Sequence, residues 1–494
     1  MSESESASKE NSVFILRYAE VGIKGKRARG MMEGKIRTNF RDLLSRLGDS
    51  CEIRSSRGRI FVSGFKSEDN VRSALSRTMG IKSFSHATEI RIKSIEDILD
   101  YCKSRFPSQL KGKKFAVRAR RAGGQSFTSM DIARAVGDSL YSFSAGVDLG
   151  NPDLEINVEV RDNRAYIFTD SQNGPGGLPI GSEGRVAALV SGGIDSPVAA
   201  WYLLKRGCMV DYVFISLAHP ADTVEFLKSI RSLIKFWSSG YIPSINIVDG
   251  TPLLEEILLS GKVRVPNITY KRALYEIAKR IALEKNGNGI VTGESIGQVS
   301  SQTPANLMAI NAGFDFPVFR PLVGLDKDEI TEVARRIGTF PETSMGEFCS
   351  LFSQEVVLRA DPEIIKSDFS SVLGLEEMVR TRVQISASEI DDVIESLQKS
   401  NLLSSEIPEG AYAFDLRAPL DFREWHYPGA VNIGLKQLKD TLIQEGKWDR
   451  PVVFYCTKGL QSAYAAGIAR KMGIDSYFVP IDSLRRNQAK KVTQ

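Results

Sequence analysis

Cys456 is the residue whose surroundings most favour nucleophilic chemistry. It follows the apolar run PVVFY and precedes TKGLQSAYAAGIARKMG, which has the composition of a loop leading into a helix. A thiol in such a loop faces converging backbone N–H groups at a helix start, and these groups favour the reactive thiolate. The alternative is a small buried residue at a strand end. The loop context favours a reactive thiol.

A second chemical segment is the loop SGGIDS at residues 191–196. It lies between the apolar run VAALV and a helix expected to open at Pro197, a residue suited to the first helical turn. Two glycines let backbone N–H groups converge on an anion at the helix start. The lysine of GxxxxGK[ST] is missing, which excludes the kinase and GTPase type of phosphate loop. The alternative is a tight turn in which Asp195 or Ser196 caps the helix.

The remaining cysteines and the three histidines give no metal-site pattern. Cys51, Cys102, Cys208 and Cys349 are widely spaced, and no CxxC occurs. Zinc and iron–sulfur sites therefore lack their ligand pattern, and a disulfide scaffold is not expected. We expect no protein metal site and interpret Cys51, Cys102 and Cys208 as structural.

Positive charge is concentrated in the first third of the chain. Residues 1–170 hold 30 Lys/Arg against 22 Asp/Glu, whereas residues 171–494 hold 35 against 38. Such an excess can bind the phosphate backbone of nucleic acid, although a solvated surface is the alternative. The candidate RNA-binding residues form two clusters: Lys24, Lys26 and Arg27, then Lys111, Lys113, Lys114, Arg118 and Arg120.

Length and composition exclude several other classes. A chain of 494 residues should divide into about three or four domains. No uninterrupted apolar run reaches the roughly 18 residues of a membrane span. The start MSESESASKENS is polar and acidic, unlike a signal peptide, so we expect a disordered tail and a cytoplasmic location.

Hydrophobic periodicity predicts the elements that position these residues. Residues 13–170 mix strands with helices, as in α+β domains, and the Gly- and Pro-rich stretch at 171–184 predicts a boundary. Strands and helices then alternate, which is typical of a doubly wound parallel sheet. A new α/β module starts near residue 411. We therefore predict a multidomain α/β fold with domains at 1–75, 76–170, 171–360 and 406–494, and a helical connector at 361–405.

The loop SGGIDS resembles the PP-loop of ATP pyrophosphatases, which cleave ATP between its α and β phosphates and adenylate a substrate oxygen. Four further segments, GGLPIG, TGESIGQVSSQTPANL, RPLVGLDKDEI and RYAEVGIKGKR, are similar to the tRNA 4-thiouridine synthetase family (ThiI), whose members also supply sulfur for the thiamine thiazole. The resemblance runs from about residue 13 to 355 and continues into the last module. It implies a ferredoxin-like domain, then an RNA-binding THUMP domain, then the PP-loop domain.

The resemblance also implies site residues. Asp195 would position Mg²⁺ or the nucleotide, and Lys327 would stabilise charge on the phosphates. The expected ATP contacts are Leu189, Val190, Ser191, Gly192, Gly193, Asp195, Ser196, Phe214, Ile215, Lys271, Gly293 and Gln302. Four of them, Leu189, Val190, Phe214 and Ile215, also read as strand core, so their backbone would make the contact.

The last module resembles a rhodanese domain, in which a cysteine carries a persulfide. Asp415 and Arg417 match the family's DxR element, and HYPGA at 426–430 matches its HxPGA turn. Gln461 stands where many rhodaneses have arginine, which disfavours thiosulfate chemistry and leaves persulfide carriage. The resemblance makes Cys349 the second catalytic cysteine, which would close a disulfide with Cys456 to release the product.

These features predict an ATP-dependent tRNA sulfurtransferase that converts uridine, by family likeness uridine 8, to 4-thiouridine. Expected partners are tRNA, a cysteine desulfurase, a thiol or thioredoxin-type reductant and a thiazole sulfur carrier, with no membrane; a homodimer stays open. One alternative is a sulfur-relay protein for thiazole synthesis. Another is an RNA-binding adenylating ligase with an unused last domain. A THUMP-containing methyltransferase is disfavoured because no methyl-donor loop follows.

Overall fold

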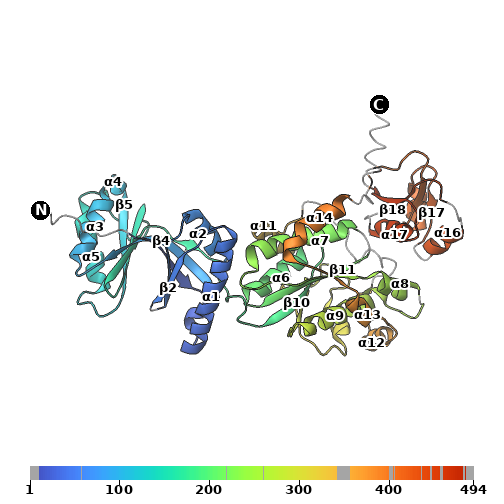
Figure 1. Cartoon of the computed structure of the whole chain (residues 1–494), viewed down its shortest axis with the longest axis horizontal. Coiled ribbons are helices and arrows are strands. Elements are labelled where there is room, and N and C mark those ends of the chain that lie inside the picture. The colour runs from blue at the N-terminus through green and yellow to red at the C-terminus, as the bar shows by residue number, and fades with distance from the viewer. Residues whose placement is uncertain are drawn as a thin grey trace. The chain divides into compact units, whose positions relative to one another are not determined.

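The computed structural model describes residues 11–484 except 57, 218–219, 260, 342–356, 400–403, 405, 435–436, 445–447, 457–459 and 482–483. The chain forms two compact units that divide between Ser182 and Glu183, inside the stretch expected as a boundary. Figure 1 labels the elements of both.

The first unit is built on one continuous sheet. Its strands run in the order β2-β3-β1-β4-β8-β7-β5-β6, and β9 also pairs with β4. The long strand β4 pairs with β1 on one side and β8 on the other, so the sheet crosses the boundary expected at residue 75. The strand bounds are β1 Asn11–Tyr18, β2 Glu52–Ser56, β3 Arg59–Ser63, β4 Ile81–Arg91, β5 Lys114–Ala122, β6 Gly146–Val147, β7 Leu154–Arg161, β8 Arg164–Phe168 and β9 Gln172–Asn173.

The α-helices that enter the cores of this unit cover one face of that sheet. Buried side chains of α1 and α2 pack on Phe14, Leu16 and Phe84, and those of α3 and α5 pack on Phe115 and further residues of β4, β5, β7 and β8. Strand register places all of these strand residues on the same side. The helix bounds are η1 Glu20–Ile23, α1 Lys26–Arg46, α2 Glu68–Leu75, α3 Glu96–Arg105, α4 Pro107–Leu110 and α5 Ser129–Tyr141.

The second unit begins with a doubly wound sheet of strand order β14-β13-β10-β11-β12-β15. Strands β10 to β14 are parallel, as the alternation of strands and helices predicted, because a helical crossover returns the chain to the same edge. Strand β15 is antiparallel to β12. The strand bounds are β10 Arg185–Leu189, β11 Met209–Ser216, β12 Ile245–Asp249, β13 Ile290–Val291, β14 Val318–Phe319 and β15 Val383–Ile385.

The segment expected as a connector adds to this sheet domain. It contributes β15 as an edge strand, and buried side chains of its helix α13 join the core formed by α9 and the sheet. A few apolar residues suffice to attach the segment to the sheet domain, because they lie on the buried faces of short helices. The helix bounds are α6 Asp195–Lys205, α7 Pro220–Ser232, η2 Leu233–Trp237, α8 Thr251–Leu259, α9 Pro266–Glu284, α10 Pro304–Asn311, α11 Lys327–Ile337, α12 Pro362–Ser370, α13 Leu375–Arg380, η4 Ala387–Glu389 and α14 Ile390–Lys399.

The last module is a small parallel sheet of strand order β17-β16-β18-β19. Its central strand β18 is buried along its whole length, which explains the uninterrupted apolar run VVFYC. The bounds are β16 Tyr412–Asp415, α15 Pro419–Glu424, β17 Val431–Asn432, α16 Leu438–Gln444, β18 Val452–Cys456, α17 Leu460–Lys471 and β19 Ser476–Pro480. The predicted multidomain α/β fold class is confirmed.

Across the part of the chain that the structure describes, no helix combines the length and apolar character needed to cross a membrane.

Candidate functional site

The loop SGGIDS lies at the switch point of the doubly wound sheet. It follows β10, and the chain runs from β10 to β11 on one side and later returns to β13 on the other. In such sheets the loops at the carboxyl ends of these two strands diverge and leave a crevice for a ligand. Helix α6 begins at Asp195, two residues before the predicted start, because an acidic residue suits the positive first turn of a helix.

Two serine hydroxyls hold the loop closed. The Ser191 backbone N–H donates to Ser196 Oγ at 2.8 Å, and the two hydroxyl oxygens lie 3.0 Å apart. Gly193 N–H donates to Ser191 Oγ at 3.3 Å. Ser196 is buried and Ser191 is exposed, so Ser196 supports the loop from its buried side and Ser191 lies at the surface.

Asp195 and Lys327 meet at this loop although 132 residues separate them. Lys327 Nζ donates to Asp195 Oδ1 at 2.7 Å, and both side chains keep access to solvent. Lys327 is the first residue of α11, whose start is fixed by a capping box between Asp326 and Glu329. A carboxylate and an ammonium group therefore stand together beside a phosphate-type loop.

Gly293 closes the other side of the crevice. It follows β13, and a Cβ at this position would lie 2.7 Å from the Ser196 backbone nitrogen and 2.8 Å from the Ser196 Cα. Only glycine permits this approach to the start of α6. The structure thus explains by packing a residue that sequence resemblance assigned to nucleotide binding. Leu189, Val190, Phe214 and Ile215 lie at the ends of β10 and β11, where all but the half-buried Leu189 are buried.

A buried charge network lies behind Gly293. Glu294 Oε2 accepts hydrogen bonds from Tyr275 Oη at 2.5 Å, Thr292 Oγ1 at 2.9 Å and Arg320 Nε at 2.8 Å. Its Oε1 lies 3.7 Å from Lys271 Nζ. Burial acts to raise the pKa of Glu294, but the charges of Lys271 and Arg320 and these hydrogen bonds outweigh it and hold the pKa below its usual value.

This network connects Lys271 with the loop that contains Gly293 and Gln302. Gln302 Oε1 accepts a hydrogen bond from the Ser295 backbone N–H at 3.3 Å, which closes the loop on itself. Lys271, Gly293 and Gln302, which were all predicted to contact ATP, therefore lie in or beside the segment that follows β13. The sequence analysis did not single out Glu294 and Arg320, although both lie in the family-like segments TGESIGQVSSQTPANL and RPLVGLDKDEI.

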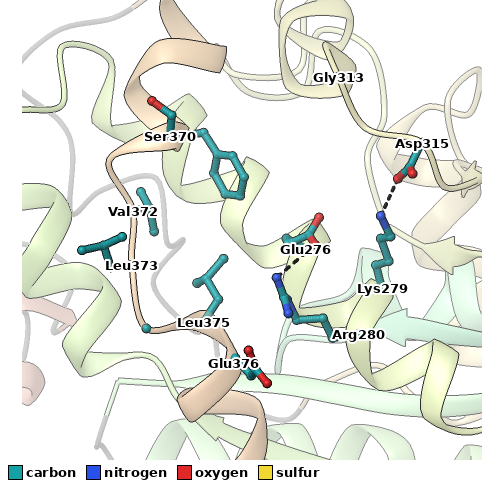
Figure 2. Close-up of a pocket in the computed structure, with 12 residues that line it drawn as sticks. Glu276, Lys279, Arg280, Gly313, Asp315, Ser370, Val372, Leu373, Leu375 and Glu376 are labelled. Atoms are coloured by element: carbon teal, nitrogen blue, oxygen red, sulfur yellow. Dashed lines mark hydrogen bonds and ion pairs between the residues drawn. The ribbon is translucent and has the colours of Figure 1, made fainter.

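A hollow lined by described residues lies elsewhere in the same unit. Figure 2 shows a hollow of about 660 Å³ between α9 and the α12–α13 segment. Its charged walls are already paired, Lys279 with Asp315 and Arg280 with Glu276. None of the predicted nucleotide contacts lines it. Because the chemistry gathers at the carboxyl edge of the sheet, we do not assign this hollow to the nucleotide.

Cys456 is the last residue of β18, as predicted, and is 3% exposed. Its Sγ lies 3.5 Å from the Ser462 hydroxyl in the first turns of α17. The loop between strand and helix, which includes Lys458, lies outside the described residues. The cysteine is therefore placed at a strand end facing a helix start.

Asp415 and Arg417 form a buried ion pair in the same sheet. Arg417 Nη2 lies 2.6 Å from Asp415 Oδ2, and the Arg417 backbone N–H donates to Asp415 Oδ1 at 2.9 Å. Arg417 also donates to the Trp425 carbonyl oxygen. The pair therefore pins the loop after β16 to the turn that contains His426, which is a structural role.

The four described cysteines, Cys51, Cys102, Cys208 and Cys456, are not in disulfide bonds. Burial raises the pKa of Cys51 to about 11 and that of Cys102 to about 12, in keeping with structural thiols. Cys349 lies outside the described residues, so the Cys349–Cys456 disulfide stays a prediction.

The predicted RNA-binding residues lie in two places on the first unit. Lys26 and Arg27 start α1, with Lys24 just before it. Lys111, Lys113, Lys114, Arg118 and Arg120 lead into and along β5, and all five are exposed. Arg118 Nε pairs with Glu155 at 3.2 Å, so part of this positive charge is offset.

No group of three or more His, Cys, Asp or Glu side chains among the described residues could hold a metal ion. Asp195 is a single carboxylate at the phosphate loop. This donor set fits Mg²⁺, which commonly takes one or two carboxylates together with substrate phosphates.

Four protein-family models match consecutive parts of the chain. They are a ThiI ferredoxin-like domain at residues 13–85, a THUMP domain at 93–170, the thiamine biosynthesis protein (ThiI) at 181–373 and a rhodanese-like domain at 397–482. The ThiI model covers the loop SGGIDS, Lys271, Gly293 and Lys327, and the rhodanese model covers Cys456.

Whole-chain similarity extends these matches. A tRNA sulfurtransferase of Thermoplasma acidophilum is 41% identical over 97% of this chain and 97% of its own length. A "Probable tRNA sulfurtransferase" of Sulfurisphaera tokodaii is 36% identical over 74% of this chain and 98% of its own length. The crystal structure of a 4-thiouridine synthetase–RNA complex with bound ATP matches with a TM-score of 0.65 and 31% identity, covering 76% of this chain and 99% of that one.

Proposed function

Since the chain belongs to the tRNA sulfurtransferase family, we propose that it uses ATP and a Cys456 persulfide to convert a uridine of tRNA, uridine 8 by family likeness, to 4-thiouridine. The observation that carries the proposal is the pairing of Lys327 with Asp195 at 2.7 Å beside the SGGIDS loop. The loop N–H groups, the start of α6 and Lys327 offer positive charge to a triphosphate, and the similar solved synthetase holds ATP.

The first step activates the uridine. O4 of uridine attacks the α-phosphorus of ATP, forming an O–P bond and releasing pyrophosphate as the Pα–O–Pβ bond breaks. The loop amides and Lys327 stabilise the negative charge that develops on the phosphates. Asp195 would hold Mg²⁺, which supplies charge neutralisation on the phosphate oxygens when bound.

The second step transfers sulfur. The terminal sulfur of a Cys456 persulfide attacks C4 and displaces AMP, leaving the nucleoside joined to Cys456 through a disulfide bond. The Cys349 thiolate then attacks Cys456 Sγ, which releases 4-thiouridine and forms the Cys349–Cys456 disulfide. A thiol or thioredoxin-type reductant returns both cysteines to thiols, and a cysteine desulfurase reloads Cys456.

The relative from Sulfurisphaera tokodaii is shorter than this chain. Nearly its whole length matches only 74% of this chain, so about a quarter of this chain has no counterpart there. About 125 residues of this chain are therefore unmatched, more than the 86 residues of the rhodanese-like match that contains Cys456. The module would deliver sulfur, whereas the rest of the chain would bind tRNA and activate the base.

A second role in the supply of sulfur to the thiamine thiazole through a sulfur-carrier protein is supported by the description of the family model over residues 181–373. The two roles share the loading of Cys456. They differ in the acceptor, because only thiolation of tRNA requires the first unit.

The test separates activation from sulfur transfer. The Cys456→Ala variant should form no 4-thiouridine in vitro with a desulfurase and cysteine, yet should still release pyrophosphate from ATP when tRNA is added. A Lys327→Gln variant should lose both. Cys102→Ala, at a buried position, serves as the control and should keep both activities. Wild-type levels of 4-thiouridine from the Cys456→Ala protein would refute the proposed role of this residue.

A further inference from the structure

One face of the sheet in the first unit carries no core helix. Its apolar centre is formed only by strand residues, Val13, Ile15, Phe61, Ala87, Tyr166 and Phe168, all of them buried. The α-helices α1, α2, α3 and α5 pack on the opposite face. These strand residues are buried although no helix of the described chain joins their cluster, so strand side chains and loops cover them.

Arginines provide part of this cover. Strand register brings arginines from six strands to the helix-free side: Arg54 lies opposite Phe61, Arg120 opposite Glu159, and Arg161 opposite Arg164. Arg17 lies two residues beyond Ile15 on β1, and Arg59 two residues before Phe61 on β3. We call this surface the arginine face, defined by Arg17, Arg54, Arg59, Arg120, Arg161 and Arg164.

Two buried carboxylates fix the guanidinium groups. Glu89 Oε2 lies 2.6 Å from Arg54 Nη2, and Arg164 pairs with its other oxygen. Glu159 Oε1 lies 3.1 Å from Arg59 Nε and 2.5 Å from Arg161 Nη2. Each carboxylate therefore holds two arginines from different strands, and each group of three keeps one net positive charge.

Aromatic rings orient further guanidinium groups. Arg17 Cζ lies 5.0 Å from the centre of the Phe168 ring, and its Nη1 donates to Ser85 Oγ at 3.0 Å. Arg54 Cζ lies 4.6 Å from the centre of the Phe61 ring. A guanidinium group held over a ring keeps its position before a ligand arrives, which reduces the entropy lost on binding.

Positive charge around Glu159 exceeds what that one carboxylate can offset. Burial lowers the pKa of Arg17, and the neighbouring charges of Arg59 and Arg120 act in the same direction, while Glu159 and, more weakly, Asp170 oppose them. The pKa of Arg59 is lowered in the same way by burial and then by Arg161 and Arg120, again against Glu159. Four guanidinium groups thus surround Glu159, with only the weaker effect of Asp170 beside it, an arrangement that an additional anion would stabilise.

We propose that the arginine face binds the phosphate backbone of RNA, with Glu89 and Glu159 acting as positioning residues for the arginines. The proposal rests on the proposed function, because it takes tRNA as the ligand. Arginine suits this task, since its planar group of N–H donors matches phosphate oxygens in pairs. The face extends over strands of both the ferredoxin-like and the THUMP parts, which β4 joins in one sheet, so one RNA segment could contact both.

RNA fits the surface better than a protein partner. Arginine is also enriched at protein interfaces, but these surround an exposed apolar centre, whereas here the apolar cluster is buried beneath the charges. The face offers six guanidinium groups against two buried carboxylates. Net positive charge of this density matches a polyanion.

Two variants and one control of the full chain test the proposal. The first variant is Arg17→Gln with Arg120→Gln. The second is Arg54→Gln and Arg164→Gln with Glu89→Gln, which leaves no buried carboxylate without its partners. The control, Arg41→Gln with Arg105→Gln, removes two exposed arginines from α1 and α3 on the other side of the sheet. Binding of unmodified tRNA is measured by fluorescence anisotropy at several salt concentrations, after thermal melts have compared the folding of each protein.

We expect Kd for tRNA to rise about tenfold in each face variant, and the slope of log Kd against log salt to fall by about one per lost phosphate contact. The control should match the wild type. Two face variants are used so that, if one of them misfolds, the other still tests the proposal.

If both face variants bind tRNA as the control does, the proposal is overturned while the proposed function stands. If the wild type itself fails to bind tRNA, both are overturned. The proposal is also overturned if tRNA affinity persists and the variants instead change self-association in sedimentation velocity, because the face would then be a protein contact.

Discussion

Replacing Glu294 by glutamine should destabilise the PP-loop domain more than any single change of an exposed charge. Glu294 is 5% exposed and lies between Lys271 and Arg320. Glutamine has nearly the same shape but no charge. Two half-buried cations would then lose their counter-ion. The Glu294 Oε2 atom, which accepts three hydrogen bonds, could also be replaced by an N–H donor. Breaking a buried ion pair from one side costs about 3–5 kcal/mol.

Urea unfolding of the full chain, followed by circular dichroism, would measure this loss. The matched control is Glu377→Gln, which breaks an Arg380–Glu377 pair that is exposed on both sides. We expect no measurable change for the control. Tyr275→Phe removes one hydrogen bond to the same carboxylate and the hydroxyl that accepts from Arg320 Nη2 at 3.1 Å, but leaves the charges in place. Its effect should lie between them, at about 1.5–3 kcal/mol.

The pH dependence gives an independent readout. Because the pKa of Glu294 is held below its unfolded value, this group stabilises the fold fully above about pH 4.3 and loses that contribution as pH falls through the lower folded pKa. The Glu294→Gln protein lacks this titration, so its stability should fall less steeply in acid than that of the wild type. A Glu294→Gln protein as stable as Glu377→Gln, with an unchanged acid slope, would refute the reasoning.

Two further changes test the packing around the sites. Gly293→Ala should raise KM for ATP at least tenfold and cost about 1–3 kcal/mol of stability, because its Cβ would lie 2.7 Å from the Ser196 backbone nitrogen. Steady-state pyrophosphate release measures the change in KM. The control is Gly297→Ala, whose Cβ meets no atom within 4 Å but whose φ is +80°, so it introduces backbone strain without a clash. Asp415→Asn should lower the stability of the rhodanese-like module by about 3 kcal/mol, since it leaves Arg417 buried without its carboxylate. Trp425 lies beside Arg417, so its fluorescence follows the unfolding. An unchanged unfolding transition would contradict a structural role for the pair.

Local sequence patterns could predict the chemical loops because each is encoded by neighbouring residues. The run VAALVSGGIDSP contains a buried strand, a glycine turn and a helix start, and the structure places these elements within a few residues of the prediction. The run VVFYC likewise becomes a buried strand that ends at Cys456. Family resemblance assigned Asp195 and Lys327 separately to the nucleotide site. Their ion pair was not predicted, since nothing local connects residues so far apart.

The segment at 361–405 shows where composition misleads. Few large apolar residues predicted a connector, yet Val383–Ile385 pairs with β12 and completes the edge of the sheet. An edge strand needs backbone hydrogen bonds more than apolar side chains, so its sequence carries a weak signal. Glu294 was missed for a related reason. A lone acid after a short strand looks exposed until the fold places Lys271, Tyr275 and Arg320 around it.

Of the arginine face, only Arg120 could be predicted from a charge run, because strand pairing brings its other arginines together from separate parts of the sequence. A run such as Lys111–Lys114 gives a local excess of charge, but it lies in the turn before β5 and only Lys114 belongs to that strand. Arg17, Arg54 and Arg164 are each isolated along the chain, and only strand pairing gathers them on one side. Their acids, Glu89 and Glu159, also lower the apparent local charge in the sequence. Once folded, those same acids hold the guanidinium groups in place, so residues that mask the signal in the sequence help to organise the surface.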